Sequence, residues 1–218
     1  MTARVLVIEH QSDAPVGGAG RWLAESGRDI AFVRPGSPLP RPDGWEAVVC
    51  LGSRESAYDD AVPWIAHERA FLSAVDAHGG RILGICFGAQ QLATVFGGRV
   101  ERAPRPERGW IQVTGEDPFS GPWFAWHHDR VIAPEQARIH ARTDLAVQAF
   151  SIRGHLGVQF HPEIGEPLIR SWMQTTSRVA GLAEVGAGPE TVLADTLLHA
   201  AEARQGADAL FHTFFSSP

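Results

Sequence analysis

The stretch "RILGICFGAQQLATVFGG" (residues 81–98) changes abruptly from an apolar run into a helical pattern, and this change constrains the fold more than any other feature of the chain. The run "RILGI" predicts a short buried strand. The run "GAQQLATVFGG" predicts a helix that ends at the paired glycines. Cys86 lies at the corner between strand and helix, and Gly84 and Gly88 flank it in the pattern G-x-C-x-G.

A cysteine flanked in this way is typical of a nucleophile elbow, a sharp turn that holds the nucleophile in a strained backbone conformation. Side chains two residues before and after Cys86 would clash in such a turn, so glycine is the expected residue at positions 84 and 88. The N-terminus of the following helix would point at the sulfur and favour the thiolate form. The pattern alone fits a buried structural cysteine in an ordinary turn equally well, so the rest of the chain has to decide.

Apolar runs of strand length alternate with helical patterns before and through this turn. Strands are predicted over "RVLVIEH", "DIAFVRPG", "WEAVVCLGS" and "RILGI", and helices over "GGAGRWLAESG" and "VPWIAHERAFLSAVDAHGG". This alternation predicts a parallel sheet with helices on both faces. The carboxyl ends of parallel strands share one edge of the sheet, where functional sites gather, so we expect "CLGS" and "GIC" to meet there.

The chain changes character in its second half. Short apolar runs between residues 109 and 165 predict strands joined by turns, with antiparallel pairing, and the pattern is helical again after Pro167. At 218 residues the chain fits one domain, with residues 184–218 as a helical C-terminal tail. The predicted fold class is therefore α/β: an open, mostly parallel sheet with helices on both faces and a small antiparallel addition.

Charge and cysteine content exclude several classes of partner. The net charge is −6 and no basic tract is present, which argues against nucleic acid or an anionic membrane. No stretch approaches the ~20 apolar residues of a membrane span, and the N-terminal apolar run is too short for a signal peptide. The two cysteines, Cys50 and Cys86, suit a reducing compartment. We therefore expect a cytoplasmic protein.

A cysteine nucleophile needs a base and usually a group that orients the base. Ten histidines are available, and most have ordinary structural interpretations, including His10 near a strand end. His161 differs because it ends the run "LGVQFHPE", in which Pro162 breaks the strand and Glu163 follows two residues on. Cys86, His161 and Glu163 are therefore the predicted nucleophile, base and orienting carboxylate. Taken alone, the histidine segment would more often be a turn-capping His-Pro.

Four blocks of the sequence resemble the class I (triad-type) glutamine amidotransferase family: "CLGSRESAYDD", "ILGICFGAQQLA", "WHHDRVIAP" and "GVQFHPE". They occur in the order of that family and near its spacing, and "ERGWIQV" between them also resembles a family segment. The similarity spans Val5 to Met173 and is to the amidotransferase domain of GMP synthase and its stand-alone relatives above all. The fold that the resemblance implies is flavodoxin-like, which agrees with the predicted sheet.

The resemblance implies that Cys86 attacks the side-chain amide of glutamine, forms a γ-glutamyl thioester and releases ammonia. His161 would deprotonate the thiol and protonate the leaving amine, with Glu163 orienting the ring. The backbone N–H groups of Phe87 and Ser53 would stabilise the oxyanion of the tetrahedral intermediate.

The resemblance also implies how the substrate is held. Gln90 would help to hold the glutamine, with Gly52 beside it, and main chain near His127 and His128 would contact the α-amino and α-carboxylate groups. The three histidines His127, His128 and His161 lack a compact ligand spacing, so we expect no metal. No cofactor is expected either.

The chain departs from the family pattern at two points. The usual Gly-Gly-Pro is replaced by Gly52-Ser53-Arg54, and His128 replaces a common glycine. If the second position requires a positive φ, Ser53 is strained there. Arg54 adds a permanent positive charge at the expected rim of the pocket, so we hypothesise that the substrate carries a second acidic group. The ordinary alternative is an ion pair within the loop of Arg54, with Glu55, Asp59 or Asp60.

The sequence shows neither a G-x-x-x-x-G-K-[ST] loop nor a second domain that could receive ammonia. Three functions therefore stay open. The favoured one is a glutaminase, cleaving a C–N bond and supplying ammonia to a separate synthetase subunit. The second is a stand-alone γ-glutamyl peptidase that uses the same chemistry on a larger γ-glutamyl compound. The third is a catalytically silent binding or regulatory module.

Overall fold

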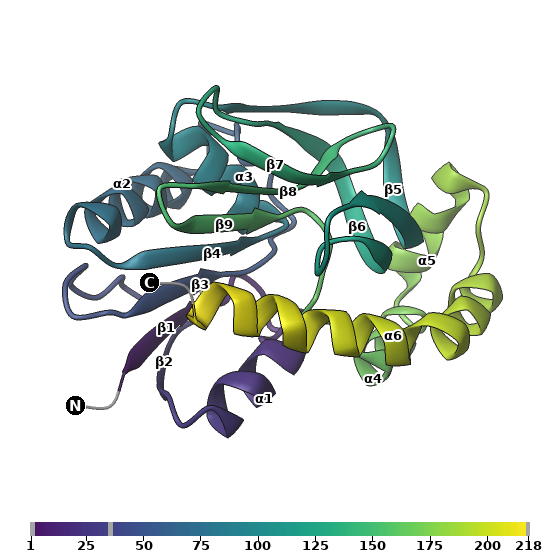
Figure 1. Ribbon diagram of the computed structural model, residues 1–218. Coiled ribbons are helices and arrows are strands. Elements are labelled where there is room, and N and C mark those ends of the chain that lie inside the picture. The colour runs from purple at the N-terminus through teal and green to yellow at the C-terminus, as the bar shows by residue number, and fades with distance from the viewer. Residues whose placement is uncertain (1–2, 35–36, 217–218) are drawn as a thin grey trace.

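The computed structural model describes residues 3–34 and 37–216, and within them nine strands form one mixed sheet in the order β2-β1-β3-β4-β9-β8-β7-β5-β6 (Figure 1). The first five of these strands are parallel to one another. In spatial order they are β2 (Asp29–Val33), β1 (Arg4–Ile8), β3 (Ala47–Cys50), β4 (Arg81–Ile85) and β9 (His155–Val158). The predicted parallel strands are thus confirmed; Pro35, which we expect to end the second one, lies outside the described residues.

The remaining strands pair antiparallel, as predicted for the second half of the chain. They are β8 (Val147–Ile152), β7 (Arg138–Arg142), β5 (Arg99–Gly115) and β6 (Gly121–Ile132). β9 belongs to both parts, because it is antiparallel to β8 and parallel to β4. Ile85 at the end of β4 is therefore directly paired with Val158 at the end of β9.

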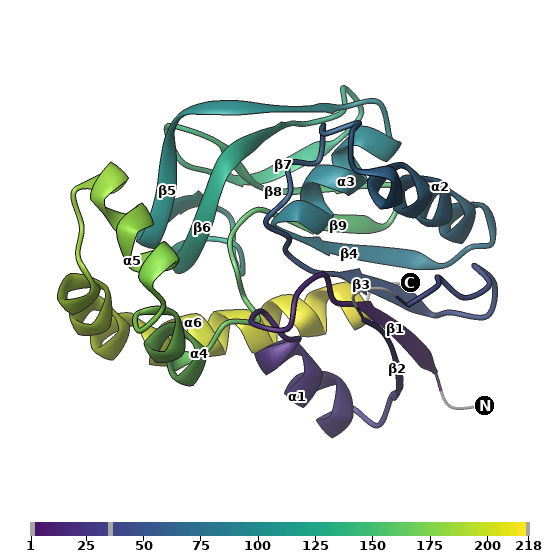
Figure 2. The ribbon, with the colours of Figure 1, turned by 180° about the vertical axis from the view of Figure 1, so that it is seen from behind.

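Helices cover both faces of the parallel strands, as Figures 1 and 2 show. α2 (Pro63–Ala77) and α3 (Phe87–Val95) lie on one face, and α1 (Gly17–Glu25) and α6 (Pro189–Ser216) lie on the other. Successive residues of a strand point to opposite faces. Val5 and Val7 of β1 accordingly pack in the core beneath α1 and α6, whereas Leu6 and Ile8 pack beneath α2 and α3.

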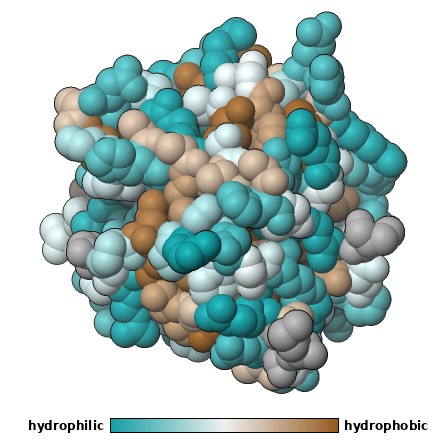
Figure 3. Space-filling view, turned by 90° about the vertical axis from the view of Figure 1, so that its left-hand side faces the viewer, coloured by the Kyte–Doolittle hydropathy of each residue, from teal (hydrophilic) through white to brown (hydrophobic). Residues whose placement is uncertain are grey.

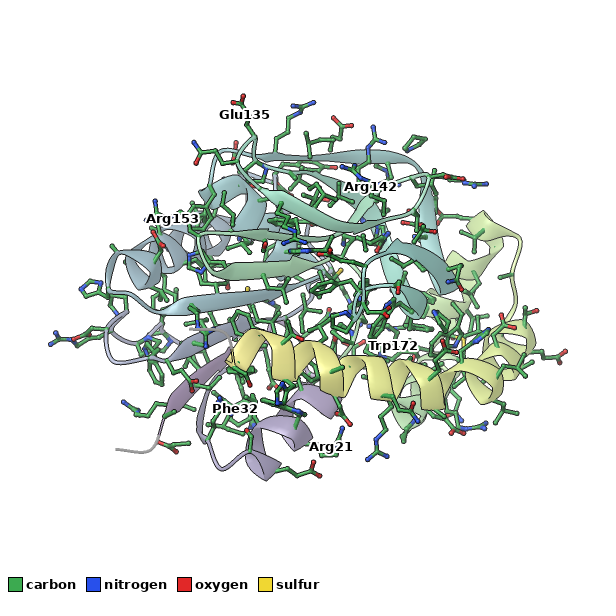
Figure 4. All side chains as sticks on the ribbon, viewed as in Figure 1. Arg21, Phe32, Glu135, Arg142, Arg153 and Trp172 are labelled. Atoms are coloured by element: carbon green, nitrogen blue, oxygen red, sulfur yellow. The ribbon has the colours of Figure 1, made fainter. Side chains whose placement is uncertain are left out.

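The expected C-terminal tail is an integral part of the core. α6 buries five side chains against β1, β4 and α1, namely Ala207, Leu210, Phe211, Phe214 and Phe215. Figure 4 shows side chains filling the space between α6 and the sheet. Before α6, the chain forms α4 (Glu166–Trp172), α5 (Thr176–Leu182) and a 3₁₀ turn (Ala183–Val185), which lie beside β5 and β6.

One strand is longer than the sequence indicated. β5 begins at Arg99, whereas the pattern predicted a strand only from Gly109 onward. The missed part contains Pro104 and Pro106, which argue against a strand because proline cannot donate to the ladder. The structure accommodates them at a shift in register between Arg102 and Glu107.

Among the described residues, no helix combines the length and the apolarity that a bilayer span requires. Figure 3 shows hydrophilic and hydrophobic side chains interspersed over the face that carries the edge of β2 and the end of α2.

Candidate active site

Cys86 occupies the turn between β4 and α3 in a backbone conformation that L-residues rarely adopt, with φ 53° and ψ −107°. Such a conformation costs about 1–3 kcal/mol and persists only where the surroundings enforce it. The flanking glycines explain how it is enforced: a Cβ on Gly84 would overlap the carbonyl of Gly88, and a Cβ on Gly88 would overlap the carbonyl of Cys50. The expected reason for both glycines is thus confirmed, and the turn has the geometry of a nucleophile elbow.

His161 reaches the same place from the end of β9. Its backbone N–H donates to the carbonyl of Phe124 in β6 at 2.8 Å, which anchors the loop. A Cβ on Gly52 would lie 3.2 Å from Cε1 of His161 and 3.7 Å from Cβ of Cys86, so the imidazole and the thiol are neighbours. Nδ1 of His161 lies 2.7 Å from Oε1 of Glu163. The structure therefore brings together the three residues that the sequence predicted as a triad.

The electrostatics of this group favour the charged form of His161. Burial lowers the pKa of His161, but the charges of Glu163 and Cys86 and their hydrogen bonds outweigh burial and raise it to about 10. The ring is therefore an imidazolium at neutral pH. A cysteine nucleophile in this position can attack a carbonyl carbon, and the buried imidazolium of His161 can then protonate the leaving group.

Two backbone N–H groups beside the thiol have no acceptor. Ser53 and Phe87 line the same cavity as Cys86. Within the described residues, neither backbone N–H donates a hydrogen bond to another part of the protein. The condition for strain at Ser53 is not met, because the described non-glycine residues with positive φ are Cys86 and Arg153. Serine therefore fits this position without a backbone penalty.

The triad opens into a cavity of about 410 Å³. The other predicted substrate-binding residues all line it: Gly52, Arg54, Gln90, His127 and His128. Gln90 is 4% exposed, and its Nε2 donates to Oε1 of Gln159 at 3.3 Å. The His127 side chain is buried, with Nδ1 2.9 Å from the carbonyl of Asp129, whereas the His128 side chain is 30% exposed.

Arg54 forms its ion pair with a residue outside its own loop. It pairs with Asp13, which comes from the segment before α1, rather than with Glu55, Asp59 or Asp60. Asp13 also accepts a hydrogen bond from Nη2 of Arg178 at 3.0 Å. The ordinary alternative predicted for Arg54 is therefore wrong, and Asp13 joins two guanidinium groups at one wall of the cavity.

Arg178 and Trp172 were not found from the sequence. Arg178 in α5 is 7% exposed, and its guanidinium lies 3.4 Å from the centre of the Trp172 ring. Its Nε is buried and has no hydrogen-bond partner in the part of the chain that the structure describes. Trp172 in turn donates from Nε1 to the carbonyl of Asp13 at 2.7 Å. No sequence pattern marks Arg178, because it falls in a helix whose other residues are ordinary. No sequence pattern marks the half-buried Asp13 either.

The histidines considered as metal ligands do not converge. His127, His128 and His161 all border the cavity, but each is engaged with a different group of the protein. Among the described residues, one set of three potential ligands lies within reach of a single ion, and it is elsewhere: His10, Cys50 and Glu68.

Comparison with known families gives one match that covers just over half of the chain. Residues 52–167 match the family model described as "Glutamine amidotransferase class-I". The chain is 34% identical over 202 residues to the glutamine-hydrolyzing GMP synthase of Thermus thermophilus, covering 83% of this chain and 37% of that protein. It is 42% identical over 95 residues to one of the subunits of the glutamine-hydrolyzing GMP synthase of Sulfurisphaera tokodaii, covering 38% of this chain and 50% of that relative. The chain thus spans about a third to a half of the length of these relatives.

Solved structures share the fold over the whole chain. A glutamine amidotransferase from Thermotoga maritima superposes with a TM-score of 0.89 at 24% identity and covers 100% of both chains. A glutamine amidotransferase from Methylobacillus flagellatus superposes with a TM-score of 0.90 at 23% identity, covering 99% of this chain and 95% of the other. α4, α5 and α6, which follow the region of family similarity, are therefore part of the shared fold.

Proposed function

Because this chain belongs to the class I glutamine amidotransferase family, we propose that it hydrolyses the side-chain amide of glutamine and releases ammonia. The observation that carries this proposal is the placement of Cys86, His161 and Glu163 beside two backbone N–H groups that have no acceptor among the described residues. A nucleophile, a proton donor and an oxyanion hole are the parts that acyl transfer to sulfur requires.

The reaction proceeds in two halves. The thiolate of Cys86 attacks the side-chain carbonyl carbon of glutamine, and the N–H groups of Ser53 and Phe87 stabilise the resulting oxyanion. The imidazolium of His161 gives its proton to the leaving nitrogen, so that ammonia departs and a γ-glutamyl thioester remains. His161, now neutral, takes a proton from water as the water attacks the thioester. Glutamate is then released, and the starting thiolate–imidazolium pair is restored.

Glu163 keeps the ring of His161 in position through these steps. It accepts from Nδ1, which leaves Nε2 for the proton that moves during catalysis. Glu163 itself is fixed because its carbonyl accepts the N–H of Gly18 at 2.7 Å. The start of α1 approaches this carbonyl closely, since a Cβ on Gly17 would overlap it.

We further propose that the ammonia serves a separate synthetase. The Sulfurisphaera tokodaii relative is named as one of the subunits of a GMP synthase, and the matched region of the Thermus thermophilus relative is a part of a longer GMP synthase. Both names connect this type of domain with a partner activity. The acceptor of the ammonia is the part of the proposal that depends on these relatives alone.

A second candidate is a γ-glutamyl peptidase, which would use the same triad on a substrate with a further carboxylate. The observation that favours it is the cationic wall of the cavity, where Arg54 and Arg178 share a single carboxylate, Asp13. The unpartnered Nε of Arg178 can donate to an anion. Arginine binds carboxylates well, and often through two parallel hydrogen bonds.

Turnover measurements separate the candidates. The purified chain is given glutamine or a γ-glutamyl dipeptide, and ammonia or free amino acid is measured, with Cys86→Ala as the inactive control. Ammonia release from glutamine that depends on Cys86 is expected. A higher kcat/KM for the dipeptide would favour the peptidase. If neither substrate is turned over and no thioester can be trapped, the chain is a binding or regulatory module.

A further inference from the structure

A buried chain of polar groups lies behind the oxyanion hole. His10 follows β1, and its side chain is 5% exposed. Its Nδ1 lies 3.1 Å from the carbonyl oxygen of Gly52, and its Nε2 lies 2.8 Å from Oε2 of Glu68 in α2. The other carboxylate oxygen of Glu68 accepts from the thiol of Cys50 at 3.3 Å. These groups join the ends of β1 and β3 to α2, next to the catalytic turn.

The positions of the protons follow from the partners. A carbonyl oxygen can only accept, so Nδ1 of His10 must carry the proton that it shares with Gly52. Burial, and then the charge of Glu68, raise the pKa of Cys50 well above its usual value, so Cys50 donates as a neutral thiol. The contact between Nε2 and Glu68 fixes the orientation of the His10 ring, so that Nδ1–H faces the carbonyl of Gly52.

We propose that His10 is a positioning residue that sets the oxyanion hole by holding the peptide unit between Gly52 and Ser53. The carbonyl of Gly52 and the N–H of Ser53 belong to the same planar unit, so fixing one fixes the direction of the other. The hydrogen bond from His10 also polarises that unit and strengthens the N–H as a donor. The inference rests on the proposed function, in which the N–H of Ser53 stabilises the oxyanion.

The ring of His10 also contacts the second proposed oxyanion donor. It packs edge-on against Phe87 with the ring centres 5.0 Å apart, and it stacks on Trp64 at 5.2 Å. Phe87 supplies the other backbone N–H beside Cys86. One buried side chain thus contacts both the Gly52 carbonyl, in the peptide unit that carries the N–H of Ser53, and the side chain of Phe87. α2 supports this side chain from behind through Trp64 and Glu68.

A metal site is the competing interpretation of the same residues, since one ligand atom from each of His10, Cys50 and Glu68 lies within 4.8 Å of the others. The hydrogen bonds argue against it. Nε2 of His10 and the thiol of Cys50 each lie within hydrogen-bond distance of a separate oxygen of Glu68, and Nδ1 of His10, outside this set, lies 3.1 Å from the carbonyl oxygen of Gly52. The arrangement is that of a hydrogen-bonded support.

Two substitutions of nearly equal size test the proposal. In His10→Asn the side-chain nitrogen takes the place of Nδ1 and can still donate to Gly52, whereas in His10→Gln it takes the place of Nε2 and reaches only Glu68. For glutamine hydrolysis we expect His10→Gln to lower kcat by about 10- to 100-fold with little change in KM, because deleting an oxyanion donor outright costs about 10²–10³-fold. His10→Asn should recover most of this loss.

A reaction of Cys86 that forms no oxyanion distinguishes a misplaced oxyanion hole from general damage to the active site. Alkylation of Cys86 by iodoacetamide displaces iodide from a saturated carbon, so its rate should be similar in the wild type and both variants. Equal kcat in the two variants, or alkylation that falls in step with kcat, would overturn the proposal.

One spectroscopic measurement needs neither turnover nor a variant. In ¹⁵N,¹³C-labelled wild-type protein, NMR should show a protonated Nδ1 on His10 with a coupling through the hydrogen bond to the carbonyl carbon of Gly52. An unprotonated Nδ1 would contradict the inference even if the enzyme is active. A wild type that turns over neither glutamine nor a γ-glutamyl dipeptide would instead count against the proposed function, and the spectrum would still decide whether His10 holds this peptide unit.

Discussion

Nδ1 of His161 lies 2.7 Å from Oε1 of Glu163, and both side chains are almost completely buried. The carboxylate is within hydrogen-bond distance of the ring, so its charge acts on His161 directly. Together with the Cys86 sulfur it overcomes the effect of burial and raises the pKa of the ring to about 10. His161, the proposed proton donor, is therefore already protonated before the substrate binds.

The pH dependence of hydrolysis should report this proton. Since His161 holds its proton below its raised pKa, kcat/KM for glutamine should be lost as the pH rises through about 10. Glu163→Gln removes a charge that raises this pKa, so the alkaline limb should move to lower pH. The variant should retain more activity than His161→Ala, and Cys86→Ala should have none. Superimposable pH–rate profiles of the wild type and Glu163→Gln would contradict the assigned role of Glu163.

The two cysteines should differ sharply in reactivity. A glutamine-like chloroketone should label Cys86 alone, because Cys50 is fully buried and its pKa is raised, first by burial and then by Glu68. Mass spectrometry should show one adduct on the wild type and on Cys50→Ser, and none on Cys86→Ala. Labelling of Cys50 at a comparable rate would show that the nucleophile has been misidentified.

The strained turn should carry a measurable stability cost. Cys86→Gly and Cys86→Ala both remove the sulfur, but only glycine adopts a φ of 53° without penalty. The free energy of unfolding of Cys86→Gly should therefore exceed that of Cys86→Ala by about 1 kcal/mol or more. Urea denaturation of the two inactive variants measures this difference. Equal stabilities would mean that the turn relaxes when the sulfur is absent.

How far the sequence predicts the site depends on how local each signal is. The elbow could be predicted because Gly84, Cys86 and Gly88 lie within five residues and each has a steric reason. His161 could be predicted because an apolar strand and Pro162 mark its position. Arg178 could not, since it faces the cavity only because α5 turns back toward β6, and a single arginine on a helix carries no such information.

The fold shows the same limit. β1, β3 and β4 have continuous apolar runs because both of their faces are buried, whereas the edge strand β2 is partly exposed. All four strands predicted in the first half of the chain are present. The pairing of β5 with β6 could not be predicted from the sequence, because prolines lie at the shift in register between the two strands. The importance of His10 was missed because its partners, Gly52 and Glu68, lie 42 and 58 residues away in the chain.

The last helix should contribute strongly to stability through one of its faces. Phe211 is 1% exposed and contacts Trp22 of α1 with ring centres 6.0 Å apart, whereas Leu197 on the same helix is 69% exposed. Phe211→Ala should lower the free energy of unfolding by about 3–5 kcal/mol. Leu197→Ala should change it by less than about 0.5 kcal/mol. Similar effects of the two substitutions in denaturant titrations would place α6 outside the cooperative core.

The rim arginine should select among substrates. If Arg54 binds a second acidic group, Arg54→Gly should lower kcat/KM for a γ-glutamyl dipeptide more than for glutamine. Asp13→Asn, which frees Arg54 and Arg178 from their shared carboxylate, should shift the preference toward the dipeptide. Steady-state kinetics on both substrates provide the comparison. If Arg54→Gly lowers both values by the same factor, Arg54 does not select the substrate and the glutaminase assignment is strengthened.

The insertion of β9 beside β4 has a consequence for the protein during its synthesis. Cys86 leaves the ribosome while the segment that carries His161 and Glu163 has not yet been translated, and at about 5–20 residues per second the delay is about 4–15 seconds. The pairing of Ile85 with Val158 can form only after that delay. Until then no imidazolium is present to stabilise a thiolate. The proposed catalytic group can therefore assemble only when the central ladder closes.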